Sequence, residues 1–410
     1  MNRIVARLIA LAAVAAALPA FAQIRIAYID PLSGAMAATG EHGLHEVEFA
    51  AERINARGGI LGQKVEIVPM DNKLSTQESL ILLKSAADQG IHYILQGNGS
   101  SVAGALIDAL NKHNERNPDK TIVFLNYAAV DPDFTNDKCS FWHFRFDANS
   151  DMKMDALTSY MKGEKKIQKA YLLNQDYSFG HQVAKAARAM LESKRPDVKI
   201  VGEELHPLAK VKDFAPYVAK IQASGADSII TGNWGSDLQL LVKAARDANL
   251  RADFYTYYAG VVGTPPALGE SGVDRVKVVS YWNANSVSPA GQTFVDAYKK
   301  KYGATFDPYS QALRLALEFL SQAMAQAKST DPLPVARAME GMTLEGAFGK
   351  VEMRAADHQL IQPLFIATFV KAGGKLRNSA DGTTDFAFRQ EAKIDGPATA
   401  RPTTCKMQRP

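Results

Sequence analysis

The sequence is poor in cysteine, in long apolar runs and in excess charge of one sign. Its 410 residues include 2 cysteines and carry a formal net charge of +4, with no basic run. A near-neutral chain without a basic patch argues against nucleic acid as a partner. Beyond the N-terminal segment no stretch has about 20 consecutive apolar residues, so no membrane-spanning helix is predicted there. The cysteines and histidines do not fall at zinc-site spacing, and we expect no metal and no other cofactor.

Residues 1–22 have the layout of a secretory signal peptide. Arg3 and Arg7 flank the start of an apolar run, Leu8–Leu18, which is too short to span a bilayer. The sequence Ala-Phe-Ala then ends at Ala22 and supplies the small residues that signal peptidase needs. We therefore predict cleavage after Ala22 and a soluble mature protein in the periplasm, rather than an uncleaved membrane anchor.

Strand and helix patterns alternate along the chain, which predicts parallel sheets covered by helices on both faces. A capping box at Ser75–Glu78 opens one of the helices. The first group of apolar strands is expected at 24–29, 65–70, 93–96 and 121–125. The pattern restarts near residue 150, with strands expected at 169–174, 199–205, 228–231 and 253–257. We predict an α/β protein with two doubly wound lobes.

The last third of the chain is expected to return to the first lobe and then end in loop. A strand at Val276–Tyr281 would carry the chain back, and two long helices follow at 289–302 and 309–327. Two further β segments are expected at 351–353 and 364–370, and the tail after Lys375 is rich in Gly, Thr, Asp and Pro, so we predict loop there. Export to an oxidising compartment favours a Cys139–Cys405 disulfide over two free thiols, tying this tail to the end of the first lobe.

Residues just after each strand are candidates for ligand binding, because ligands of open α/β sheets bind beyond the carboxyl ends of the strands. Gly97–Ser101 follows one strand and precedes a helix, whose N-terminal N–H groups and dipole suit a carboxylate. The alternative is a turn that only caps the helix. Small residues follow the next strand at Ala128–Val130, and strand ends of the second lobe carry the aromatics Tyr177, Phe179, Trp234 and Tyr258. We interpret these aromatics as a pocket wall rather than as core.

Short motifs along the chain carry a family resemblance. The most specific, Ile54–Gly62, reads Ile-Asn-Ala-Arg-Gly-Gly-Ile-Leu-Gly. The others are Ser33-Gly34, Gly40, Asp71, Gly99–Ser101, Ala128-Ala129 and Tyr177–Gly180. On these residues the chain resembles the type I periplasmic binding proteins, and among them the leucine/isoleucine/valine-binding proteins of ABC importers. The resemblance covers about residues 24–375.

The resemblance implies two α/β lobes joined by three hinge crossovers. One lobe would hold 24–147 and 282–350, the other 148–281 and 351–375, with 376–410 as a tail. The implied function is the periplasmic substrate-binding component of an ABC importer. Such a protein works as a monomer, closes on a small carboxylate-bearing ligand and passes it to an ABC permease in the inner membrane. Because the same fold also senses ligands for receptors, a sensor subunit with a separate signalling partner is the alternative.

Ligand contacts carry over residue by residue from the family pattern. The matching positions are Thr39, Ser100, Ser101, Ala128, Ala129 and Val130 in the first lobe, and Phe179, Trp234 and Tyr258 in the second. Two positions depart from the pattern: Val130 replaces a threonine, and the acid expected near Ala259 is absent. A buried ammonium without an acceptor costs several kcal/mol. We therefore expect a carboxylate without a standard α-ammonium, such as an aromatic or keto acid, or an amino acid held differently.

Catalytic and metal-binding interpretations are weaker. Ser100 follows a glycine between a strand and a helix, but the Gly-x-Ser-x-Gly spacing of a hydrolase is missing, so we do not expect an enzyme. His42 and His45 share a helix face beside Glu41 and Glu46, without any metal-binding motif. We interpret them as part of a solvated helix start, with acidic side chains that favour the helix dipole.

Overall fold

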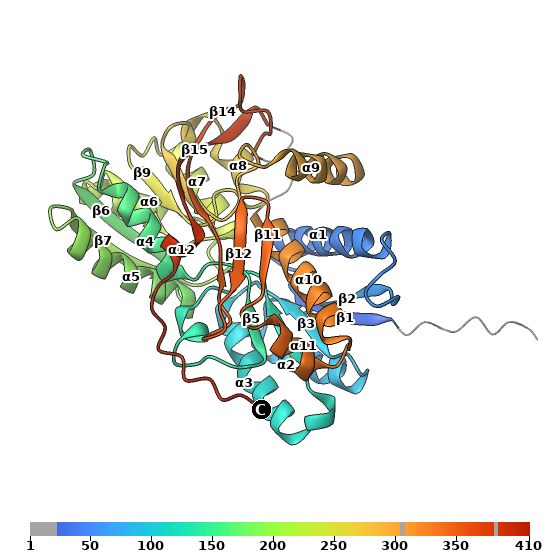
Figure 1. The fold of residues 1–410 in the computed structure, drawn as a ribbon. Coiled ribbons are helices and arrows are strands. Elements are labelled where there is room, and N and C mark those ends of the chain that lie inside the picture. The colour runs from blue at the N-terminus through green and yellow to red at the C-terminus, as the bar shows by residue number, and fades with distance from the viewer. Residues whose placement is uncertain (1–22, 304–307, 381–383) are drawn as a thin grey trace, which may run out of the picture.

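The computed structural model describes residues 23–303, 308–380 and 384–410, so the predicted signal peptide at 1–22 lies outside the described residues. Two helix-covered sheets form separate lobes, and a small third sheet lies between them (Figure 1). The prediction of a two-lobed α/β protein is therefore confirmed. Within the described ranges, no helix is long and apolar enough to cross a membrane.

The first lobe contains a five-stranded parallel sheet in the order β2-β1-β3-β4-β5. Its strands are β1 (Ile24–Asp30), β2 (Val65–Asp71), β3 (Tyr93–Gln96), β4 (Val123–Asn126) and β5 (His143–Arg145). The connecting helices are α1 (Ala37–Asn55), α2 (Thr76–Asp88) and α3 (Ser100–Arg116), with 3-10 turns η2 (Pro118–Lys120) and η3 (Pro132–Thr135). All residues of β3 and β4 are buried, as expected for strands covered on both faces. The predicted cap of α2 is present, because Ser75 Oγ accepts a hydrogen bond from the Glu78 backbone N–H.

The Ile54–Gly62 motif has a local structural explanation. Asn55, the last residue of α1, both donates to the Val65 carbonyl and accepts from the Val65 N–H, each at 2.8 Å, which ties the helix end to the start of β2. Gly59 has a φ of +76° and lies so close to the Gln63 carbonyl that no Cβ would fit. The motif is therefore a tight link between α1 and β2.

The second lobe contains a seven-stranded mixed sheet in the order β15-β14-β10-β9-β8-β6-β7. Its parallel strands are β6 (Lys169–Gln175), β7 (Lys199–His206), β8 (Ser228–Thr231), β9 (Asp253–Thr256) and β10 (Val276–Ser280). Two antiparallel strands, β14 (Leu364–Lys371) and β15 (Phe386–Ile394), extend the sheet beyond β10. The helices are α4 (Ser150–Met161), α5 (Ser178–Lys194), α6 (Ala215–Ser224), α7 (Gly235–Asp247) and α8 (Thr264–Leu268), with a 3-10 turn η4 (Gly269–Gly272).

The remaining elements connect the two sheets. The antiparallel strands β11 (Thr343–Gly346), β12 (Gly349–Met353) and β13 (Leu360–Ile361) make the small sheet. The helix α10 (Pro308–Ala327) packs on α1 and on α11 (Pro332–Met339), while α9 (Pro289–Tyr302) contacts α1 through Phe294 and Phe49. The chain crosses between the lobes after β5, after β10 and between β13 and β14 (Figure 1).

The structure corrects the expectation for the tail. Loop was predicted after Lys375, yet Phe386–Ile394 forms β15 and pairs with β14 along its whole length. The polar composition of this segment misled the prediction because β15 lies at the sheet edge, where alternating polar side chains face solvent. A short helix, α12 (Gly396–Thr399), follows. The three-residue strand β5 was also missed, since so short a strand has no recognisable period.

After α12 the chain runs back along the first lobe to the C-terminus (Figure 1). Cys405 forms the expected disulfide with Cys139, just beyond η3. Beside it, the Thr403 hydroxyl donates to the Thr135 carbonyl at 2.6 Å and the Thr404 N–H donates to the Asn136 side chain at 3.0 Å. A segment that leaves the second-lobe sheet is thus bonded covalently to the first lobe.

Removing this disulfide is expected to destabilise the protein. The bond closes a loop between residues separated by 266 positions, and cross-links of this kind typically stabilise by about 2–4 kcal/mol through the unfolded chain. A double variant, Cys139→Ser with Cys405→Ser, should lose about that much free energy of unfolding in urea titrations. Dithiothreitol should reproduce the loss in the wild type and have no effect on the variant. Equal stability of the two proteins would contradict the expectation.

Candidate functional site

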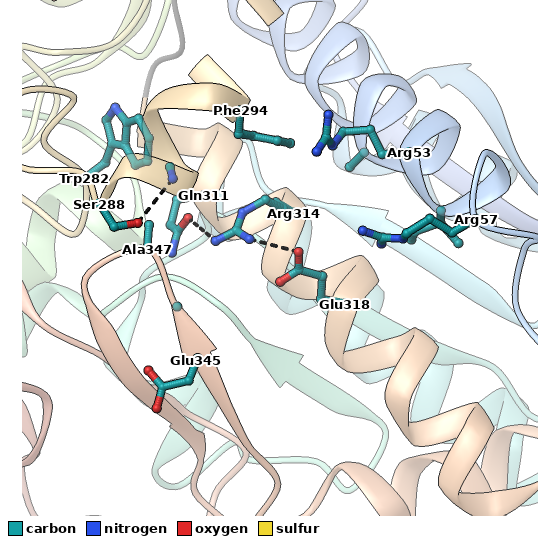
Figure 2. Close-up of a pocket in the computed structure, with 14 residues that line it drawn as sticks. Arg53, Arg57, Trp282, Ser288, Phe294, Gln311, Arg314, Glu318, Glu345 and Ala347 are labelled. Carbon is teal, nitrogen blue, oxygen red and sulfur yellow. Dashed lines mark hydrogen bonds and ion pairs between the residues drawn. The ribbon is translucent and has the colours of Figure 1, made fainter. Parts of the chain in front are cut away.

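Among the hollows of the described structure, one lies beside α1 and another lies between the lobes. The first, about 420 Å³, lies between α1, α9, α10 and β11 (Figure 2). The second lies between the two lobes, where β3 and β4 of the first sheet and β6, β8 and β9 of the second all end. Because ligands of open α/β sheets bind beyond the carboxyl ends of the strands, the interlobe cleft is the candidate functional site.

The first-lobe side of the cleft is the turn Gly97–Ser100 at the start of α3. A Cβ on Gly97 would lie 2.7–2.8 Å from ring atoms of Tyr127, and Gly99 adopts a φ of +93°. Both positions therefore need glycine. This geometry brings the N-terminal backbone of α3 and the buried Ser100 side chain to the cleft. Free N–H groups and the positive end of the helix dipole suit an anion at this point.

A buried carboxylate holds the turn in place. Asp30, the last residue of β1, accepts hydrogen bonds from the backbone N–H groups of Gly97 (3.2 Å) and Asn98 (2.9 Å) and from the Tyr127 hydroxyl (2.7 Å). Burial raises the pKa of Asp30 to about 7, although these hydrogen bonds lower it. Asp30 thus fixes the anion-binding turn from beneath and does not line the cleft.

The Ala128–Val130 loop forms the second part of the first-lobe side. The Asn126 side chain accepts from the N–H groups of Ala128 (3.2 Å) and Ala129 (2.8 Å) and donates to the Ala129 carbonyl (2.8 Å). Asn126 therefore shapes the loop and uses two of its backbone donors. The Val130 side chain offers only methyl groups to a ligand, where the family pattern has a hydroxyl.

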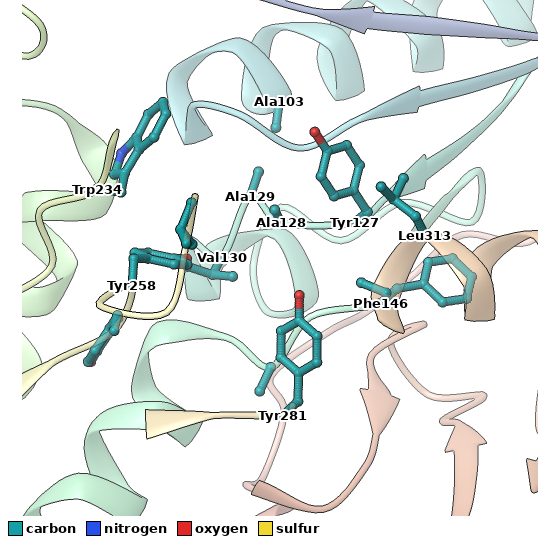
Figure 3. Packing of buried hydrophobic residues seen from close by; sticks show 14 of the residues in the cluster. Ala103, Tyr127, Ala128, Ala129, Val130, Phe146, Trp234, Tyr258, Tyr281 and Leu313 are labelled. Atoms are coloured by element: carbon teal, nitrogen blue, oxygen red, sulfur yellow. The ribbon is translucent and has the colours of Figure 1, made fainter. Parts of the chain in front are cut away.

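The second-lobe side is an aromatic wall made by Tyr177, Phe179, Trp234 and Tyr258. The Phe179 ring centroid lies 5.9 Å from those of Tyr177 and Tyr258, and the Trp234 indole N–H donates to the Tyr177 hydroxyl at 2.8 Å. Figure 3 shows Trp234 and Tyr258 opposite the Ala128–Val130 loop. All side chains that line the cleft in the described structure are uncharged.

A buried ion pair supports the aromatic wall from behind. Lys153 Nζ lies 2.7 Å from a carboxylate oxygen of Asp147 and 4.7 Å from the centre of the Tyr258 ring. Both charged side chains are almost fully buried. Burial raises the pKa of Asp147 to about 6 and lowers that of Lys153, while the mutual attraction of the pair opposes both shifts. Asp147 is paired with Lys153 and does not line the cleft.

The structure brings together seven of the nine side chains that the sequence singled out for ligand binding. Ser100, Ala128, Ala129, Val130, Phe179, Trp234 and Tyr258 all line the cleft.

The other two lie elsewhere. Ser101 is exposed on α3, and Thr39 is buried in α1 near Gly235, outside the cleft lining. Sequence reasoning did not assign a role to Asp30, although a charged residue directly after an apolar strand was a usable signal.

The lobes are in contact, so the cleft is closed. Across the opening, the Ser236 hydroxyl lies 3.7 Å from the Met36 sulfur and the Gln182 amide lies 3.4 Å from the Asp133 carboxylate. The remaining cavity measures about 10 Å³, which is room for about one water molecule. A ligand can enter only if the lobes separate.

Comparison with known proteins agrees with this architecture. A family model described as periplasmic binding protein matches residues 23–375. The Leu/Ile/Val-binding protein homolog 4 of Brucella abortus is 32% identical over 397 residues, which cover 94% of this chain and 93% of the relative. The chain belongs to the periplasmic binding protein family. Periplasmic binding proteins are non-enzymatic components of transport systems, so Ser100 is not a hydrolase nucleophile.

Solved structures place this periplasmic binding protein among type I folds. The leucine-, isoleucine-, valine-, threonine- and alanine-binding protein of Brucella ovis, in its closed conformation, superposes with a TM-score of 0.84 at 31% identity, covering 95% of this chain and 100% of that one. A solute-binding protein of an ABC transporter from R. palustris, in complex with benzoate, gives a TM-score of 0.79 at 17% identity over 94% and 100% of the two chains. The second likeness shows the shared fold alone. Family membership implies a periplasmic location, small-molecule ligands and an ABC permease.

Proposed function

We propose that this protein is the substrate-binding component of an ABC importer and captures a small carboxylate-bearing ligand by closure of its two lobes. The observation that carries the proposal is the N-terminus of α3, with the buried Ser100, facing an uncharged and aromatic-walled cleft. One lobe would contain 24–147 and 282–361 and the other 148–281 and 362–394, because the third crossing lies between β13 and β14 rather than at the expected residue 350, and β15 pairs with β14. We propose that it binds ligand as a monomer before docking on its permease.

The carboxylate of the ligand would lie against the first turn of α3. There the helix N–H groups and the Ser100 hydroxyl offer donors, and hydrogen bonds to a charged group are worth about 1.5–3 kcal/mol each. The body of the ligand would pack between the Ala128–Val130 loop and the rings of Phe179, Trp234 and Tyr258. Such rings favour an apolar or planar group by stacking.

The lining also supports a ligand without a standard α-ammonium. No carboxylate lines the described cleft, and the nearby acids have other partners. Asp30 accepts hydrogen bonds from the turn, Asp147 is paired with Lys153, and Asp131 caps η3 by accepting from the Asp133 N–H. We therefore favour an aromatic or keto acid. The alternative is an aliphatic amino acid, as the name of the 31%-identical Brucella ovis protein suggests.

A matched ligand pair tests the choice. Leucine and 4-methyl-2-oxopentanoate share a carboxylate and a side chain and differ in the ammonium group. Titration calorimetry on protein unfolded and refolded to remove bound ligand should show tighter binding of the keto acid, with benzoate as the aromatic member of the panel. Tight binding of leucine alone would leave the carboxylate site in place and contradict the argument from Val130.

Two neighbouring serines test the anion site. Ser100→Ala should weaken binding of the best ligand by about tenfold or more, because a hydrogen bond to a charged group is lost. Ser101→Ala, one position further along α3 and exposed, should leave affinity within about twofold, since surface substitutions usually change free energies by less than about 0.5 kcal/mol. Equal affinities of the two variants would show that the carboxylate binds elsewhere.

A further inference from the structure

One hollow of about 420 Å³ lies away from the interlobe cleft, and its lining is charged and aromatic. Its volume is within the size range of small-molecule sites. Its walls come from α1, α9, α10, the strand β11 and the crossover that follows β10 (Figure 2). No residue of the proposed ligand cleft lines it.

Three arginines line this hollow. Arg53 lies in the last turn of α1, Arg57 lies in the turn that follows this helix, and Arg314 lies on α10. Arg314 is neutralised by Glu318, at 2.8 Å. Within the described residues, neither Arg53 nor Arg57 has a carboxylate within 4.0 Å. The C-terminal end of α1 and the turn after it therefore bring an uncompensated positive charge to this hollow.

An aromatic ring orders the guanidinium groups. Phe294 has the Arg53 guanidinium carbon 5.1 Å and the Arg314 guanidinium carbon 5.5 Å from its ring centre. Figure 2 shows Phe294 between these two side chains and Trp282 at the opposite end of the hollow. Stacking on an aromatic face limits the motion of a guanidinium and leaves its N–H edge available for an anion.

The acids of the hollow do not cancel this charge. Glu318 is paired with Arg314, which also donates to the Gln311 side chain at 2.9 Å. Glu345, on β11, is exposed at the rim. The anion-binding edge is therefore on the α1 side, whereas Trp282 supplies flat apolar surface.

We propose that this hollow is a second binding site, which takes a small organic anion with a phosphate or carboxylate group attached to a flat apolar body. Arg53 and Arg57 hold the anionic group, because a guanidinium pairs with both oxyanions through two parallel hydrogen bonds. Trp282 contacts the flat body. The site is independent of the ligand in the cleft and of its chemistry.

The 3 tryptophans of the chain make the test specific. Trp282 lines the proposed site, Trp234 lines the cleft, and Trp142 lines a separate hollow near the C-terminus. In protein labelled with 5-fluorotryptophan, each gives one ¹⁹F resonance, assigned by single Trp→Phe variants. Titration with phenyl phosphate should shift the Trp282 resonance saturably and leave that of Trp142 in place.

Charge-matched variants complete the experiment. Arg53→Gln with Arg57→Gln should raise the midpoint of the Trp282 shift by about tenfold or more, since two charge-assisted pairings are lost. Arg116→Gln with Arg251→Gln removes the same charge from exposed positions outside the hollow and should leave the midpoint unchanged.

Three outcomes would overturn the proposed site: a Trp282 resonance that does not move, a shift confined to the Trp234 resonance, or equal midpoints in the two double variants. Equal midpoints for phenyl phosphate and inorganic phosphate would overturn the part played by Trp282. Leucine or keto-acid binding in the cleft is read from Trp234, so failure of one proposal is separate from failure of the other.

Discussion

Gly180→Ala is expected to lower the free energy of unfolding by about 3 kcal/mol, at the upper end of the cost of overpacking. Gly180 lies in the first turn of α5, and a Cβ there would overlap the backbone carbonyl of Gln175 at the end of β6. A backbone carbonyl cannot rotate aside as a side chain can, so the helix itself must move. The neighbouring Phe179 would move with it, and ligand affinity should fall together with stability.

A second glycine in the same lobe provides the control. Gly163 follows α4, and its added Cβ would meet the Tyr160 carbonyl at 3.5 Å, an ordinary contact. Gly163→Ala should therefore change stability by less than about 1 kcal/mol. Thermal and urea unfolding of the two variants measures the difference. A Gly180→Ala protein as stable as Gly163→Ala would mean that α5 has room to shift without cost.

The first lobe packs its leading helix in the same way. A Cβ on Gly40, in the first turn of α1, would overlap the Pro31 carbonyl. In each lobe a glycine of the helix that follows the first strand thus lies against backbone at the end of that strand. This close approach fixes how far the N-terminus of the helix lies from the cleft. The position matters because the backbone N–H groups at a helix N-terminus can bind an anion.

Asp30→Asn is expected to remove a large pH dependence of stability. Burial raises the folded-state pKa of Asp30 from 3.8 to about 7. A carboxyl whose pKa is higher in the folded state binds its proton more tightly there. Its contribution is therefore fully present below about pH 4 and is lost as the pH rises through about 7. At 1.36 kcal/mol per pKa unit, the change amounts to about 4 kcal/mol.

The test compares the free energy of unfolding of the wild type with that of the Asp30→Asn variant as a function of pH. The free energy of unfolding of the wild type, relative to Asp30→Asn, should fall by about 4 kcal/mol between pH 4 and pH 8. Taking the difference cancels the contributions of other titrating groups to the pH dependence of stability. Asp147 has a raised pKa of about 6 and acts in the same direction as Asp30, and the buried His143 has a lowered pKa. Parallel pH profiles would show that the turn donors keep Asp30 ionised in the folded protein.

Protonation of Asp30 is also expected to change ligand affinity. Asp30 holds the N–H groups of Gly97 and Asn98 in the conformation that presents Ser100 to the cleft. Protonation of Asp30 removes one of its acceptor sites and weakens its hold on these donors. Ligand affinity measured alongside stability should therefore decrease in acid, even though the folded protein becomes more stable there.

Local patterns were enough to predict most of the lobes. Alternating apolar strands and capped helices gave the positions of β1, β2 and β6 to within a residue or two. The edge strand β15 was not predicted because its polar side chains resemble the composition of a loop. This segment is a strand because it pairs with β14.

For the cleft, the sequence by itself determined which loops face the ligand, since these must follow the strands of a parallel sheet. It also determined the residue types there: a glycine-serine turn at a helix N-terminus, small residues and aromatics. Only the tertiary structure decided that Ser100 lines the cleft while Ser101 is exposed, because a helix turns by about 100° per residue and the direction of each side chain depends on how α3 is seated. The arginine-lined hollow likewise exists only in three dimensions, where α1, α9, α10 and β11 meet from distant parts of the chain.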